Sequence, residues 1–239
     1  MDATDQYAKA RDFANSVVPL RVKKLRRELL GLDAAKAEKY KQEFFWKAFK
    51  ALQFNDISGD YVEFGSHGGF TFRLAYDQIE KRRHERHMWA FDSFEGLPEW
   101  ATADDAHPKW KAGGMATGLD TFHGICKDHG ISQSRYTAVP GFFEDSLKVE
   151  GAKRPTDIAL AYIDCDLYSS TNTVLDFLVP RMKPGMLLAF DDYHCWSEDG
   201  ISGERRALRE LAQRSTQWTF APYQDYGWAG RSYVVEPKF

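Results

Sequence analysis

The chain has 239 residues, of which 43% are hydrophobic and 28% charged, proportions typical of a globular protein. Its net charge of −3 gives no general attraction to nucleic acid or to an anionic membrane. No apolar stretch approaches the roughly 20 residues of a membrane span, and the acidic start, Met1–Asp5, lacks a secretory pattern. Three cysteines without C-x-x-C spacing indicate a reducing compartment. We therefore expect a cytoplasmic protein with neither nucleic-acid nor membrane partners.

The first quarter of the chain has a helical pattern. Residues 5–53 are rich in charge, and we predict that residues 1–54 form a helical N-terminal extension that caps the substrate or joins subunits. A basic run at 21–27 could be a nucleic-acid patch, but nearby acidic residues favour a solvated helix face. Large apolar residues recur at helical spacing and should pack on a sheet or on a partner subunit; they are Phe44, Phe45, Trp46, Phe49, Leu52 and Phe54.

Short apolar runs alternate with helical patterns over residues 55–239, which predicts one α/β domain. We expect strands at 60–64, 88–91, 135–139, 158–163 and 186–190, and helices at 70–82, 119–128 and 203–214. Two aromatic runs, 217–223 and 231–236, predict a closing hairpin around residues 225–227. Residues 99–118 lack a regular pattern, and so long a stretch inside a compact domain is usually a functional lid or disordered.

Acidic residues follow two of the predicted strands. Asp164 and Asp166 come after 158–163, and Asp191 and Asp192 come after 186–190. Adjacent parallel strands place their C-terminal ends side by side, at the edge where open α/β sheets bind ligands. Carboxylates gathered there repel one another and need a cation or raised pKa values. The pattern favours a hard metal ion over the alternative of two helix N-caps beside solvated turns.

A glycine-rich turn follows the first predicted strand. Glu63 begins the sequence E-F-G-S-H-G-G, in which glycines let the backbone approach a ligand and the next helix offers free N–H groups. Ser66 occupies the place of the second glycine of a dinucleotide fingerprint, so that motif is poorly matched. Alone, the turn is either a ligand loop or a plain tight turn.

An acidic residue also ends the second predicted strand. Asp92 lies one strand–helix–strand unit after Glu63, where a carboxylate can accept both hydroxyls of a ribose. Together with the turn, it predicts a ligand that contains a ribose, and S-adenosylmethionine fits. Its amino-acid end would meet the stretch from Glu63 through Gly65 to Ser66, and its ribose would meet Asp92. Gly141, Phe142 and Phe143, after the third strand, would form a wall for the adenine, although one phenylalanine could equally belong to the core.

Four motifs occur in a fixed order: E-F-G at 63–65, F-D-S-F-E-G-L-P at 91–98, I-D-C-D-L-Y-S-S-T at 163–171 and D-D-Y at 191–193. As a set they closely resemble the macrocin O-methyltransferase family, over about residues 55–215. The resemblance implies the class I methyltransferase fold, a Rossmann-like, seven-stranded, mostly parallel sheet with an antiparallel C-terminal hairpin and helices on both faces. It also implies S-adenosylmethionine as donor, Mg²⁺ as cofactor and the hydroxyl of a natural-product sugar as acceptor. The chain departs from the family at 65–68, where a Val-Trp-Arg-Gly-like stretch is usual.

By the same resemblance, Asp164, Asp191 and Asp192 match the metal ligands and Asp166 matches the general base. We add Ser93 and Asp164 to the predicted donor site. Mg²⁺ would act as Lewis acid and template for the acceptor hydroxyl, and Asp166 would take its proton. His194 is the competing base because histidine titrates near neutral pH.

Three functional hypotheses remain open from the sequence. The first is an O-methyltransferase that acts on a small-molecule glycoside. The second keeps this chemistry but acts on a catechol-type or other small-molecule hydroxyl. The third is a catalytically silent ligand-binding protein, which the four aspartates argue against. The resemblance and the aromatic N-terminal helix also suggest a homo-oligomer.

Overall fold

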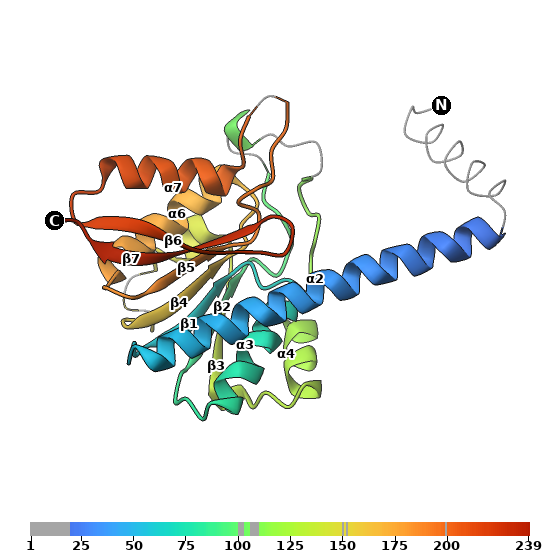
Figure 1. The fold of residues 1–239 in the computed structure, drawn as a ribbon, viewed down its shortest axis with the longest axis horizontal. Helices are drawn as coiled ribbons and strands as arrows, with labels where there is room; N and C mark the ends of the chain where they lie inside the picture. The colour runs from blue at the N-terminus through green and yellow to red at the C-terminus, as the bar shows by residue number, and fades with distance from the viewer. Residues whose placement is uncertain (1–19, 100–102, 106–109, 150, 152, 199) are drawn as a thin grey trace. The chain divides into compact units, whose positions relative to one another are not determined.

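A computed structural model describes residues 20–99, 103–105, 110–149, 151, 153–198 and 200–239 (Figure 1). The chain divides into two units, 1–40 and 41–239. Helix α2 spans Leu20–Phe54 and contributes to both. The predicted helical residues 5–19 and the side chains of the basic run at 21–27 lie outside the described part of the chain.

A seven-stranded sheet forms the centre of the 41–239 unit, with strand order β3-β2-β1-β4-β5-β7-β6. The first five strands run parallel, β7 is antiparallel to β5, and β6 is antiparallel to β7. This confirms the predicted sheet and hairpin. The strands are β1 Asp60–Phe64, β2 Met88–Asp92, β3 Tyr136–Pro140, β4 Ile158–Ile163, β5 Leu187–Phe190, β6 Trp218–Tyr226 and β7 Gly230–Pro237.

Helices cover both faces of this sheet, as predicted (Figure 1). Helices α5 (Phe143–Ser146), α6 (Tyr168–Leu178) and α7 (Gly203–Arg214) pack on one face. Helices α3 (Phe70–Lys81), α4 (Leu119–Asp128) and the C-terminal part of α2 pack on the other. Three short 3₁₀ helices, η1 (Ala103–Asp105), η2 (Gln133–Arg135) and η3 (Val179–Arg181), lie in the connections.

Alternation along the strands divides the core between these two faces. In β1, Val62 and Phe64 point to the α6 side, whereas Tyr61 points to the α3 side. Because successive side chains of a strand point to opposite faces, a strand that is apolar throughout supplies both layers. In β4, all six residues are buried. The acidic residues that follow such strands are therefore held at the sheet edge by buried, well-packed backbone.

The aromatic end of α2 packs on the sheet. Phe44 stacks on Tyr226 with ring centroids 4.1 Å apart, and Phe45 stacks on Tyr162 at 5.4 Å. Phe49 and Leu52 are buried in the same layer. The exceptions are Trp46 and Phe54, whose side chains are 47% and 79% exposed. Within the 41–239 unit, sheet packing thus accounts for most of these apolar residues.

The segment predicted as a lid, 99–118, is only partly described. Residues 100–102 and 106–109 lie outside the description, whereas residues 103–105 form η1. Near its end, the Gly113 N–H donates to the Leu97 carbonyl and the Leu97 N–H donates to the Gly114 carbonyl. These bonds tie the segment to the loop that follows β2.

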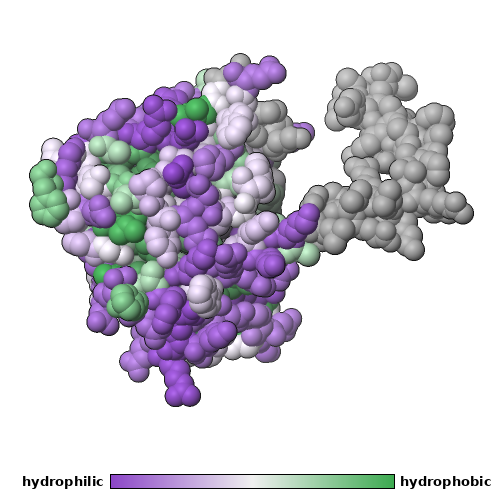
Figure 2. Space-filling model, in the orientation of Figure 1, coloured by the Kyte–Doolittle hydropathy of each residue, from purple (hydrophilic) through white to green (hydrophobic). Residues whose placement is uncertain are grey.

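The surface is polar over the face shown in Figure 2, where hydrophobic residues form separate patches among hydrophilic ones. Among the described residues, no helix is both long and apolar enough to span a membrane.

Candidate active site

The turn after β1 requires glycine at its first position. Gly65 has a φ of +87°, and a Cβ placed there would lie 1.9 Å from the Asp164 carbonyl oxygen. The Gly65 N–H donates to the Phe91 carbonyl at 2.8 Å. The turn therefore lies directly against the acidic end of β4, and a side chain at residue 65 would push the two apart.

Asp92 fixes the conformation of this turn. Its Oδ2 accepts hydrogen bonds from the Ser66 and His67 N–H groups at 2.7 and 2.8 Å, and its Oδ1 accepts from the Phe94 N–H at 2.7 Å. Oδ1 retains a second lone pair, so a ribose hydroxyl can still bind there. Ser93 holds its own loop, because its hydroxyl donates to the Gly96 carbonyl at 2.7 Å.

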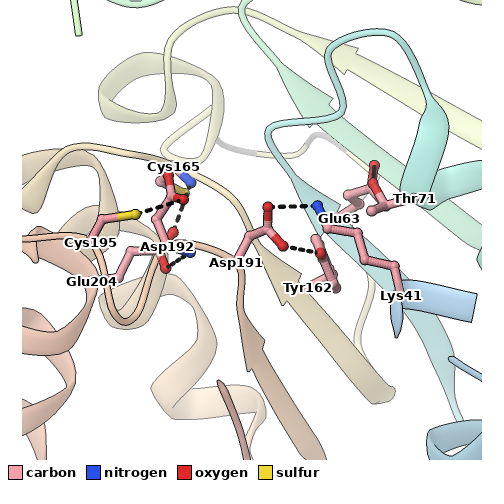
Figure 3. A network of polar contacts seen from close by, with 9 residues as sticks. All are labelled: Lys41, Glu63, Thr71, Tyr162, Cys165, Asp191, Asp192, Cys195 and Glu204. Atoms are coloured by element: carbon pink, nitrogen blue, oxygen red, sulfur yellow. Dashed lines mark hydrogen bonds and ion pairs between the residues drawn. The ribbon is translucent and has the colours of Figure 1, made fainter. Parts of the chain in front are cut away.

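Glu63 lies beneath the turn and is fully buried (Figure 3). Its Oε1 accepts a hydrogen bond from the Thr71 hydroxyl at 3.2 Å, and its Oε2 accepts one from Tyr61. Burial raises the pKa of Glu63 to about 8, although the hydrogen bonds from Tyr61, Thr71 and Ser66 oppose the rise. Within the sheet, Glu63 can therefore carry a proton at neutral pH.

A cleft opens beside the turn, with about 670 Å³ of empty space including its open mouth. We call it the donor cleft, because six residues of the predicted donor site line it: Gly65, Asp92, Ser93, Phe142, Phe143 and Asp164. Glu63, Ser66 and Gly141 do not. Phe143 also packs against Phe64 in the core, so Phe142 is the more exposed of the two phenylalanines.

Three acidic side chains converge at the edge of this cleft. Asp164, Asp166 and Asp192 each place one carboxylate oxygen within 4.8 Å of the others. Burial raises the pKa of Asp164, and the neighbouring carboxylates of Asp191, Asp192 and Asp166 raise it further. Burial and Asp192 likewise raise the pKa of Asp166. Such a group of oxygen donors suits a hard divalent cation.

Asp191 points toward Lys41 and Tyr162, away from Asp192 (Figure 3). Its Oδ2 accepts a hydrogen bond from the Lys41 ammonium at 2.7 Å, and its Oδ1 accepts one from the Tyr162 hydroxyl at 2.5 Å. Lys41 comes from α2, and nothing in its sequence surroundings indicates that it reaches the site. Each oxygen of Asp191 retains a lone pair, so its predicted role as a metal ligand is compatible with these bonds and stays a prediction.

Glu204 joins the two acidic turns from the first turn of α7 (Figure 3). Its Oε1 accepts from the Cys165 N–H at 3.2 Å and its Oε2 accepts from the Asp192 N–H at 2.9 Å. Burial raises the pKa of Glu204, and the charges of Asp192 and Asp191 raise it further. Sequence reasoning missed this residue because it lies in an ordinary amphipathic helix.

Asp166 stands between two clefts. It lines the donor cleft and also a second cleft that extends toward η1 and α7. Its φ of +59° is unusual for a residue other than glycine, and strain of this kind clusters at functional sites. His194, the competing base, lines neither cleft; its Nε2 lies 3.6 Å from Asp225 Oδ1. His67, from the glycine-rich turn, also lines the donor cleft.

A family model described as Macrocin-O-methyltransferase (TylF) matches residues 38–213, about three quarters of the chain. The chain belongs to the macrocin-O-methyltransferase family. This confirms the resemblance drawn from the four motifs, and the matched region contains both clefts and every predicted site residue.

Curated relatives of this macrocin-O-methyltransferase family member come from Streptomyces and Micromonospora. An 8-demethyl-8-(2,3-dimethoxy-alpha-L-rhamnosyl)-tetracenomycin-C 4'-O-methyltransferase of Streptomyces olivaceus is 31% identical over 145 residues, 57% of this chain and 54% of the relative. The mycinamicin III 3''-O-methyltransferase of Micromonospora griseorubida is 30% identical over 168 residues, 66% of this chain and 62% of the relative. The chain thus matches little more than half the length of these relatives.

Solved structures support the fold assignment. A calicheamicin methyltransferase aligns over 98% of this chain and 94% of its own, with a TM-score of 0.66 and 20% identity. The O-methyltransferase NovP aligns over 82% of this chain and 79% of its own, with a TM-score of 0.65 and 20% identity. At this identity the macrocin-O-methyltransferase family member shares the class I methyltransferase fold with both.

Proposed function

We propose that the protein is an S-adenosylmethionine-dependent, Mg²⁺-dependent O-methyltransferase that methylates a hydroxyl on the sugar of a natural product. The observation that supports this most strongly is the position of Asp166, which lines both the donor cleft and the second cleft. A base at such a junction can contact an acceptor hydroxyl in one cleft while the methyl donor occupies the other. The names of the curated relatives support the sugar as acceptor.

The donor would bind in the cleft beside the β1 turn. Asp92 Oδ1 would accept a hydrogen bond from a ribose hydroxyl while Oδ2 keeps the N–H groups of the turn in place. Phe142 would lie against the adenine, and Gly65 would let the methionine end approach the backbone. Glu63 would support the turn from below, since its carboxyl group is enclosed by Tyr61 and Thr71.

The acidic side chains that follow β4 and β5 would hold the magnesium ion. Asp164 and Asp192 belong both to the predicted ligand set and to the carboxylates that converge in the structure, and Asp191 would be the third ligand. The mutual repulsion that raises the pKa of Asp164 is the physical reason for a cation here. When bound, Mg²⁺ supplies Lewis acidity and a template for the acceptor oxygen.

Asp166 would act as the general base. Its carboxylate takes the proton of the acceptor hydroxyl as the oxygen attacks the sulfonium methyl group. An O–C bond forms, the C–S bond breaks, and its electron pair remains on sulfur, which leaves neutral S-adenosylhomocysteine. Burial and the charge of Asp192 raise the pKa of Asp166, which makes its carboxylate a stronger base than an exposed one.

Two wider properties complete the proposal. A homo-oligomer is consistent with Trp46 and Phe54, which are large apolar side chains exposed on α2. A cytoplasmic setting is consistent with Cys126, Cys165 and Cys195, all of which are free thiols.

Replacement of Asp166 by Asn tests the mechanism directly. The Asn side chain is close in shape but cannot take a proton, so we expect turnover to fall roughly 100- to 10,000-fold. The dissociation constant for S-adenosylmethionine, measured by calorimetry, should stay unchanged. Turnover would be followed on a panel of glycosides and catechols. Full activity of Asp166→Asn would exclude Asp166 as base, and activity on catechols alone would favour the alternative acceptor.

A further inference from the structure

The second cleft lies between η1, the start of α6 and the loop before α7. It encloses about 870 Å³ of empty space including its mouth. Asp166 marks the end that meets the donor cleft. Its lining includes Asp105, Trp110, Tyr168, Trp196 and Arg206.

Asp105 has one occupied and one unoccupied carboxylate oxygen. Its Oδ1 accepts a hydrogen bond at 2.9 Å from the Ser169 N–H in the first turn of α6. Its Oδ2 is buried and has no hydrogen-bond partner among the described residues, although the residue is only 2% exposed. A buried carboxylate oxygen without a donor is costly. A hydroxyl group supplied by a ligand in this cleft would remove that cost.

The charges around the cleft disfavour an anionic ligand. Arg206 forms ion pairs with Asp104 at 2.7 Å and with Glu210 at 3.0 Å, and it lies over the Tyr168 ring at 4.2 Å. Its charge is thus already balanced by two carboxylates. Arg206 is the cationic side chain in the described lining, while Asp105 and Asp166 leave that lining acidic. Among the described lining residues, carboxylates therefore outnumber cations, which disfavours a phosphate group.

Aromatic side chains provide the apolar part of the cleft. Trp110, Tyr168 and Trp196 line it, and Trp196 is 63% exposed. Flat apolar surfaces with a few well-placed polar groups are usual in small-molecule sites. A sugar ring presents both apolar C–H faces and hydroxyl groups, so it matches this combination.

We propose that the second cleft binds the acceptor as an uncharged glycoside, one of whose sugar hydroxyls donates a hydrogen bond to Asp105 Oδ2. This inference rests on the proposed function and narrows it, because it selects a sugar on a neutral aglycone over a sugar attached to a nucleoside diphosphate. The solved calicheamicin enzyme is named as a TDP-rhamnose 3'-O-methyltransferase, so a nucleotide sugar is the competing class of acceptor.

The test compares two probes that carry the same sugar. The protein, loaded with S-adenosylhomocysteine and Mg²⁺, is titrated by calorimetry with 4-nitrophenyl α-L-rhamnoside and with thymidine diphosphate-rhamnose. We expect the neutral rhamnoside to bind at least tenfold more tightly. Asp105→Asn keeps an acceptor for the Ser169 N–H but replaces the free oxygen with a donor, so it should weaken rhamnoside binding roughly 10- to 100-fold.

Controls separate this inference from the broader proposal. Asp120→Asn removes an equal charge from an exposed position on α4 and should change neither affinity. In Asp105→Asn, the affinity for S-adenosylhomocysteine should stay unchanged, and the melting temperature should not fall, because a buried charge is removed. Equal or tighter binding of the nucleotide sugar, normal rhamnoside binding by Asp105→Asn, or no rhamnoside binding at all would each overturn the inference. Failure of S-adenosylhomocysteine itself to bind would instead refute the proposed function.

Discussion

At the scale of single residues, Glu63 illustrates how burial sets chemistry. The carboxyl group is fully buried on β1 and faces Tyr61, Ser66 and Thr71, with the Lys41 charge further away. Its pKa rises from 4.5 to about 8. Below pH 4.5 the folded and unfolded chains are both protonated at this site. Between pH 4.5 and 8 only the unfolded chain ionises, so the contribution of Glu63 to folding stability is lost as the pH rises through this window.

Replacement of Glu63 by Gln should remove this pH dependence. The uncharged Gln keeps an acceptor for Thr71 but cannot ionise. We expect the free energy of unfolding of Glu63→Gln, relative to the unsubstituted protein, to increase by about 3 to 5 kcal/mol from pH 4.5 to pH 8. Urea unfolding at a series of pH values measures it. A constant difference across this range would show that Glu63 titrates normally in the folded protein.

Asp191 pairs with Lys41, so whether it also binds the metal needs a separate test. We expect Asp191 to be a metal ligand, so its loss should weaken Mn²⁺ binding at least tenfold. Binding is measured by paramagnetic resonance in Lys41→Met, so that an unpaired ammonium group does not repel the metal. In that background, Asp191→Asn is compared with Asp225→Asn, an exposed acid on β6 that should have no effect. Unchanged affinity in Asp191→Asn, with a loss in Asp166→Asn, would assign Asp166 as the ligand.

Some of these residues could be located from the sequence and others could not. Asp92 ends β2, Asp164 directly follows β4 and Asp192 lies two residues after β5, and these strands place them at the sheet edge. Lys41 and Glu204 come from helices, and only the packing of a helix on the sheet decides which of its residues meets the site. The same limit applies to Asp105, which belongs to a segment without a periodic pattern.

At the scale of elements, we predict that the turn between β1 and α3 tolerates no side chain at residue 65. Gly65→Ala would force Cβ against the Asp164 carbonyl in a left-handed conformation. We expect the variant to lose about 2 to 5 kcal/mol of stability and to bind S-adenosylhomocysteine at least tenfold more weakly. Gly68→Ala, in the same turn, meets nothing within 4 Å and serves as the matched control. Thermal unfolding and calorimetry provide both readouts. Similar behaviour of the two variants would argue against close contact between the turn and β4.

The elements themselves were largely predictable because their signals are local. Apolar runs identified β1, β2, β4 and β5, and helical spacing identified α3, α4 and α7. The hairpin differed: β6 continues to Tyr226, three residues beyond the predicted aromatic run, and its register shifts between Pro222 and Gln224. Such an irregularity depends on pairing with β7, which no local pattern reveals.

At the scale of the whole molecule, the parallel order of β1 to β5 brings all the site residues to one edge of the sheet. The motifs and their order were enough to predict the fold family, and therefore this edge. The division of the edge into two clefts that meet at Asp166 could not be predicted. It depends on how η1 and the loop before α7 pack, including the ion pair between Asp104 and Arg206.

The proposed reaction transfers a methyl group from S-adenosylmethionine to a sugar hydroxyl where the two clefts meet at Asp166. The most direct measurement uses S-adenosylmethionine with an isotopically labelled methyl group, Mg²⁺ and a panel of neutral glycosides, followed by mass spectrometry of the products. We expect one labelled methyl group on a sugar oxygen for each S-adenosylhomocysteine formed, and a rate of labelling at least roughly 100-fold lower with Asp166→Asn. Labelled product in equal yield from Asp166→Asn, or no labelled glycoside although the donor binds, would contradict this reaction.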